Sequence, residues 1–79
     1  MKYIKVKPNN RNYVTPEMIS EAKIVIVKNE NNYIIKKYPG SLHTVGDCIS
    51  DGVIKMITDF FSRVLVYDKA TRKIFKKNF

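Results

Sequence analysis

Three side chains close together in this 79-residue sequence could do chemistry: His43, Asp47 and Cys48. A thiol beside an imidazole can act as a nucleophile with its base, but the sequence identifies no third group to orient the histidine. The same side chains are too few for a structural zinc site, which takes four ligands, usually with paired Cys and His spacing. We therefore expect no catalytic residues, no metal site and no cofactor, and a protein that binds a macromolecule rather than an enzyme.

Carboxylates offer a second possible chemistry. Asp47, Asp51 and Asp59 could serve acid–base catalysis or bind Mg²⁺, but they fall on the solvent side of an expected helix. Lys55 and Arg63 follow two of them by four residues, in the order that favours ion pairs on a helix. We interpret these carboxylates as a solvated, salt-bridged helix face. The sequence also has no phosphate-binding glycine loop and no nucleophile elbow.

Charge is the clearest functional signal. Lys and Arg number 15 against 7 Asp and Glu, for a formal net charge of +8. The cations gather at residues 1–11 and 63–79, in expected strands, whereas the acids gather on the expected long helix. A basic surface of this kind indicates a polyanion such as nucleic acid. The alternative is A/T-rich codon usage, which raises Lys, Asn and Ile together but does not explain the segregation.

Hydrophobic periodicity and turn residues divide the chain into elements that must position these side chains. The expected strands are residues 3–7, 23–28, 33–38, 63–67 and 73–77, and the expected helices are residues 16–21 and 45–62. Thr15 caps the short helix, and Thr44 with Asp47 forms a capping box for the long one. The pattern predicts one α+β domain over residues 1–79, with a mainly antiparallel sheet of about five strands packed on one long amphipathic helix.

The long helix is expected to cover one face of the sheet with an apolar stripe, made of Val45, Ile49, Gly52, Val53, Met56 and Phe60 and widened on one side by Ile54, Ile57 and Phe61. Gly52 on that stripe suggests a close approach of helix and sheet. The β-branched run at residues 23–28 is typical of a central strand or one covered on both faces. The second face is then open, shielded by the short helix, or buried in a partner.

An open face would carry Lys beside Tyr, which predicts a platform for single-stranded nucleic acid with low sequence specificity. The candidate binding residues are Tyr3, Lys5, Lys7, Tyr33, Lys36, Lys37, Tyr38, Lys73, Lys76 and Lys77. The alternative is that these aromatic side chains close the core or fill the rim of the sheet. The scarcity of Arg argues against base-specific readout, because bidentate contacts to guanine favour Arg.

Protein binding is the second function that the sequence allows. Its Asn-, Lys- and Ile-rich composition is frequent among small phage and mobile-element proteins, which suggests a modulator or inhibitor of a host protein acting through hairpin or sheet-face contacts. Paired hairpin edges would also permit a homodimer. A single cysteine, no apolar run of membrane-spanning length and no leader-like N-terminus favour a cytoplasmic protein without a membrane partner.

Overall fold

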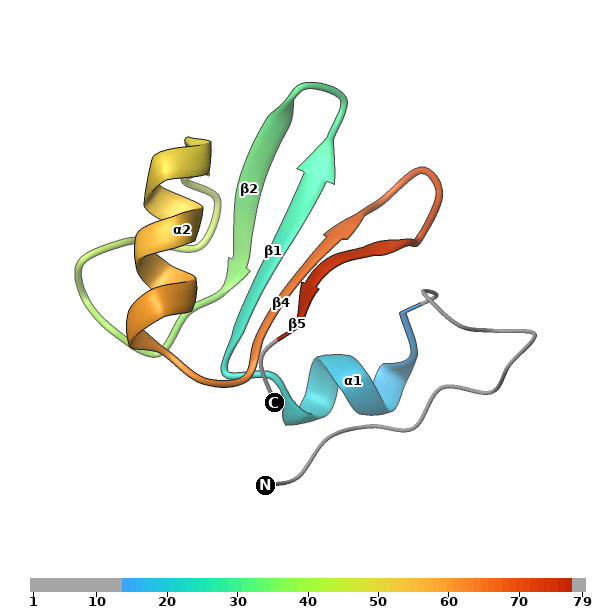
Figure 1. Cartoon of the computed structure of the whole chain (residues 1–79), viewed down its shortest axis with the longest axis horizontal. Coiled ribbons are helices and arrows are strands. Elements are labelled where there is room, and N and C mark those ends of the chain that lie inside the picture. Colours follow the sequence, from blue (N-terminus) through green and yellow to red (C-terminus); the bar gives the residue numbers. More distant parts are fainter. Residues whose placement is uncertain (1–13, 78–79) are drawn as a thin grey trace.

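A computed structural model describes residues 14–77 of the chain, and leaves the side chain of Lys77 undescribed (Figure 1). The elements in chain order are α1 (Pro16–Glu21), β1 (Ile24–Asn29), β2 (Asn32–Lys37), β3 (Cys48–Ile49), α2 (Asp51–Phe60), β4 (Val64–Asp68) and β5 (Ile74–Lys77). The predicted strand at residues 3–7, with Tyr3, Lys5 and Lys7, lies outside the described residues. The α+β class is confirmed.

The five strands form one mixed sheet in the order β3-β2-β1-β4-β5. Antiparallel hairpins β1–β2 and β4–β5 form as predicted, but β1 and β4 meet in parallel, with Ile24 opposite Val64 and Lys28 opposite Asp68. The prediction of a mainly antiparallel sheet was therefore wrong. The cause is α2, which follows β3 and returns the chain to the end of the sheet where β1 starts, as parallel pairing requires.

Both faces of the sheet are covered, by α1 on one side and α2 on the other (Figure 1). Side chains of β1 alternate between them: Val25 and Val27 pack with α1, and Ile24 and Ile26 pack with α2. All four are buried. The continuous β-branched run thus marks a central strand with two apolar faces, and the short helix is what shields the second face.

Helix α1 begins and ends where the sequence predicts. Thr15 Oγ1 accepts a hydrogen bond from the Met18 backbone N–H at 3.2 Å, and Pro16 occupies the first helical position. Ala22 leaves the helix in an extended conformation. The helix is short, but Met18 is fully buried against the β1 and β4 side chains. Packing, rather than the intrinsic stability of six residues, therefore holds α1 in place.

Helix α2 is ten residues long, so the predicted long helix over residues 45–62 was wrong. Thr44 and Asp47 close a turn instead: the Thr44 N–H donates to Asp47 Oδ2 at 2.8 Å, and the Asp47 N–H donates to the Thr44 carbonyl. Gly46 supplies the positive φ of 100°. Cys48 then pairs with β2 as part of β3, and Ser50 caps α2.

The buried side of α2 agrees with the predicted stripe only in part, on the side that Ile54 and Ile57 were expected to widen. Ile54 and Ile57 are buried against the sheet, whereas Met56 and Phe60 are exposed. Gly52 makes no close approach, because a Cβ placed there would meet only Ser50 Oγ, at 3.8 Å. The helix was predicted to start at residue 45, but it starts six residues later. The position of β3, which precedes it, therefore determines which side of α2 packs on the sheet. Within residues 14–77, no helix is long and apolar enough to cross a membrane.

Candidate nucleic-acid interface

Basic residues from four strands meet at one end of the sheet. Parallel β1 and β4 start at this end, and antiparallel β2 and β5 finish at it, as the pairs Val25–Lys37 and Leu65–Lys77 show. We define this end, the lower one in Figure 1, as the basic end. Its members are Lys23, Lys36, Lys37, Arg63 and Lys77.

The backbone holds the basic end together. The N–H of Lys23 donates to the carbonyl of Arg63 at 2.9 Å, which joins the starts of β1 and β4. An irregularity in the β1–β2 register turns Lys37 toward α1. There its Nζ donates to the carbonyls of Ile19 and Ser20, at 3.5 and 3.4 Å. These carbonyls form the negative end of α1, so they hold the cation in place without neutralising it fully.

Acidic side chains are sparse among the strands. The one acid in β1–β5 is Asp68, and it lies at the opposite end of the sheet, where β4 finishes. The carboxylates near the basic end are on helices, namely Glu21 in α1 and Asp59 in α2. Asp59 is already paired with Lys55, with 3.1 Å between Nζ and Oδ2. The predicted segregation of basic strands from acidic helices therefore holds for the described residues.

Ion pairing on α2 is not the pattern that the sequence predicts. Lys55 pairs with the acid that follows it, Asp59, rather than with the preceding Asp51. Arg63 is not on the helix at all: it lies beyond the last helical residue and has a positive φ of 60°. The expected helical pairing of Asp59 with Arg63 was based on the longer helix, and Arg63 instead joins the basic end.

The predicted binding residues are divided among several places. Lys36, Lys37 and Lys77 lie at the basic end, whereas exposed Lys73 precedes β5 at the opposite end. Tyr38 is half-buried and packs edge-on against His43 and Phe61, with ring centroids 5.5 and 6.1 Å apart. It fills the rim of the α2 core, which was the alternative reading of the aromatic residues.

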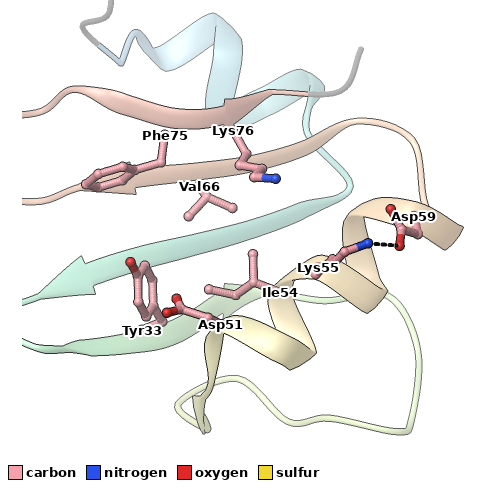
Figure 2. Close-up of a pocket in the computed structure, with 8 residues that line it drawn as sticks. All are labelled: Tyr33, Asp51, Ile54, Lys55, Asp59, Val66, Phe75 and Lys76. Carbon is pink, nitrogen blue, oxygen red and sulfur yellow. Dashed lines mark hydrogen bonds and ion pairs between the residues drawn. The ribbon is translucent and has the colours of Figure 1, made fainter.

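The remaining predicted residues, Tyr33 and Lys76, line a groove between α2 and β5 with a volume of about 390 Å³. Figure 2 shows its eight lining residues: Tyr33, Asp51, Ile54, Lys55, Asp59, Val66, Phe75 and Lys76. A register irregularity between β4 and β5 lets the neighbours Phe75 and Lys76 both face this groove. We call it the α2–β5 groove.

The α2–β5 groove has two chemically different ends. Tyr33, Asp51 and Phe75 lie at one end, and the Lys55–Asp59 pair lies at the other, toward the basic end (Figure 2). Lys28 stands over the Phe75 ring, with Nζ 5.3 Å from the centroid. That cation–π contact orients Phe75, which remains 50% exposed.

A second, almost wholly apolar groove of about 360 Å³ lies along the side of α2 next to Tyr38 and is lined by Tyr38, Leu42, His43, Met56, Ile57, Phe60 and Phe61. Leu42 and Phe60 are 83% and 80% exposed beside it. A contiguous apolar patch of this kind is a typical protein contact.

His43, Asp47 and Cys48 each have a different local environment. His43 packs on Tyr38, Asp47 accepts the turn hydrogen bond from Thr44, and Cys48 is exposed in β3 rather than in a first helical turn. Over residues 14–77, no group of three or more His, Cys, Asp or Glu side chains could hold a metal ion.

Sequence reasoning missed several contributors: Lys23 and Arg63 at the basic end, and Lys28 and Asp51 at the groove. The missing information was the parallel pairing of β1 with β4. A helix between the two hairpins was the available signal, because such a crossover returns the chain to the same end of the sheet. Comparison with known proteins adds no further assignment: no family model, curated protein or solved structure matches the chain.

Proposed function

We propose that the protein binds nucleic acid through the basic end, chiefly by electrostatic attraction and with low sequence specificity. The observation that carries the proposal is the convergence of Lys23, Lys36, Lys37 and Arg63, which lie in or directly before β1, β2 and β4, with the backbone of Lys77 in β5 at the same end. Separate segments of the sequence thus supply one local excess of positive charge. Such an excess attracts a phosphate backbone and gains free energy by releasing its counterions.

The dimensions of the basic end suit a phosphate backbone. Adjacent strands lie about 4.8 Å apart, so four neighbouring strands span about 15 Å. Double-stranded DNA carries one charge per about 1.7 Å of helix axis, and this span therefore faces several phosphates. Lysine supplies four of the five cations. Because its ammonium is a flexible point charge without the planar fork of arginine, it suits phosphate neutralisation better than base recognition.

A salt series tests the proposal. Affinity for labelled single- and double-stranded oligonucleotides should fall linearly with log salt concentration, with a slope near −3.5 for single strands and −4.5 for duplex if five cations engage, from about 0.7 and 0.9 per phosphate. The Lys23→Ala/Lys36→Ala variant should lower the steepness of these slopes by about 1.4 and 1.8. Both side chains are exposed, so the fold should be retained.

Lys69→Ala/Lys73→Ala is the matched control, because it removes the same charge from exposed residues at the opposite end of the β4–β5 hairpin. We expect it to change the slope less than the basic-end variant does. Equal losses in the two variants would show that net charge, rather than the basic end, governs binding. An absence of binding at low salt would refute the proposed function altogether.

A second candidate function, protein binding, is favoured by the apolar groove beside Tyr38. The occupant that we infer is a second copy of this chain, docked α2 against α2. Exposed Met56 and Phe60 lie four residues apart on α2, as do the oppositely charged Lys55 and Asp59. Antiparallel pairing about a two-fold axis brings Lys55 of one copy near Asp59 of the other, so the pattern is self-complementary.

The solution mass tests this second candidate. The protein should be dimeric at several hundred micromolar in sedimentation equilibrium, and Phe60→Asp should make it monomeric because a carboxylate would enter the apolar contact. Val45→Asp is the control: Val45 is also an exposed apolar residue, but it does not line the groove. A monomeric wild-type protein at that concentration would refute the α2-to-α2 dimer.

A further inference from the structure

The α2–β5 groove offers aromatic surface where the basic end offers charge. Phe75 projects from β5 and Tyr33 from β2, on opposite walls of the groove and at the same end of it (Figure 2). Ile54 and Val66 line the space between these walls. A planar ligand that enters here meets aromatic side chains on two walls and aliphatic carbon beneath, and nucleobases stack on aromatic side chains in proteins.

The charges around the groove favour a base over a phosphate. The aromatic end carries both the Asp51 carboxylate and Lys28 Nζ, 5.3 Å from the Phe75 centroid, and Asp51 can accept hydrogen bonds from the amino group of a base, which a phosphate cannot donate. Lys76 follows Phe75 along the same wall of the groove and lies nearer to the basic end. It is also the neighbour of Lys77 in β5. A backbone held at the basic end therefore continues past Lys76, with its phosphates outside the groove.

We infer that the α2–β5 groove binds one unpaired nucleobase of a single strand, stacked on Phe75 and facing Tyr33 and Asp51. The inference rests on the proposed function, because the basic end supplies the phosphate contacts that bring the strand to the groove. A paired base cannot enter, since its edge is occupied and its faces are stacked. The groove therefore makes the protein prefer single strands to duplex of the same length.

Phe75→Leu is the test variant, because it keeps an apolar side chain at a half-exposed strand position and removes the aromatic face. Val45→Ala is the control: it truncates an exposed apolar residue that lines neither groove. Phe75→Tyr retains a ring and should behave as wild type. The probe is a ten-nucleotide single strand containing 2-aminopurine, whose emission is quenched by stacking, compared with its duplex.

We expect Phe75→Leu to weaken single-strand binding about tenfold and to abolish the 2-aminopurine quenching, as loss of one stacked base predicts. Duplex affinity and its salt slope should stay unchanged, and Val45→Ala should leave all of these quantities unchanged. Equal effects of Phe75→Leu and Val45→Ala, or equal wild-type affinities for single strand and duplex, would overturn the groove assignment while leaving the basic end intact. Loss of all binding in the wild type would instead overturn the proposed function.

Discussion

Helix α1 decides whether the sheet has an open face, and Met18 is the residue that tests it. Met18 is 0% exposed and packs with Val25, Val27 and Leu65 from the two central strands. Replacing it with alanine removes most of the side chain from a buried site. Substitutions of this kind cost about 2–5 kcal/mol, because transfer energy is lost and a cavity remains.

The structure places Met18→Ala toward the middle of that range, at about 3 kcal/mol, because α1 is anchored at both ends and cannot easily close the cavity. Thr15 caps its start, and Lys37 donates to the carbonyls near its end. A domain of 79 residues has a total stability of roughly 4–12 kcal/mol. The variant should therefore unfold at much lower urea concentration, as followed by circular dichroism.

Ile19→Ala is the matched control for this experiment. Ile19 is the next residue in the same helix and is 39% exposed, so its truncation creates little cavity. Alanine also has the higher helix propensity, which offsets part of the lost contact. We expect a change below about 1 kcal/mol. Equal costs for the two variants would refute the packing of α1 on the sheet and would restore the open face that the sequence allows.

Four further variants test local features by urea unfolding. Ser50→Ala should lower the free energy of unfolding by about 0.5–1 kcal/mol, because it removes the α2 cap. Thr44→Ala should lower it less, since α2 does not begin at Thr44. A larger loss for Thr44→Ala than for Ser50→Ala would support the longer helix. Glu30→Gly should stabilise the protein by up to about 1 kcal/mol, because Glu30 adopts a φ of 59° in the β1–β2 turn; destabilisation would argue against that conformation. Lys55→Ala should change stability by less than about 0.5 kcal/mol, because the side chains of its ion pair, Lys55 and Asp59, are 75% and 58% exposed. A larger loss of stability would mean that the ion pair supports the groove wall.

The sequence predicted helix α1 and the two hairpins correctly, because residues within or next to each element determine it. Helix α1 follows from Thr15 and Pro16, and both hairpins follow from apolar, β-branched strand segments on either side of turn residues. The start of α2 could not be predicted in the same way. Thr44 and Asp47 have the spacing of a capping box, but the same side chain closes a turn when the next residues, Cys48 and Ile49, pair with β2. That choice depends on a distant strand edge.

The candidate site was harder to predict than the fold, because it depends on how strands are ordered. Lys36 and Lys77 belong to different hairpins, and they reach the same end of the sheet only because β1 and β4 are parallel. Strand periodicity predicts which residues share a face but not which strand ends are neighbours. The charge segregation was therefore predictable, whereas its location at the strand ends required the topology.

The parallel pair at the centre of the sheet also determines when the protein can fold. Each hairpin closes a short loop, but Ile24 must find Val64 across about half of the chain, and such long-range pairing slows the folding of small domains. A nascent chain that stops before residue 64 leaves β1 without the partner that covers its inner edge. The core and the basic end therefore form in the same late event, after β4 and β5 have been synthesised.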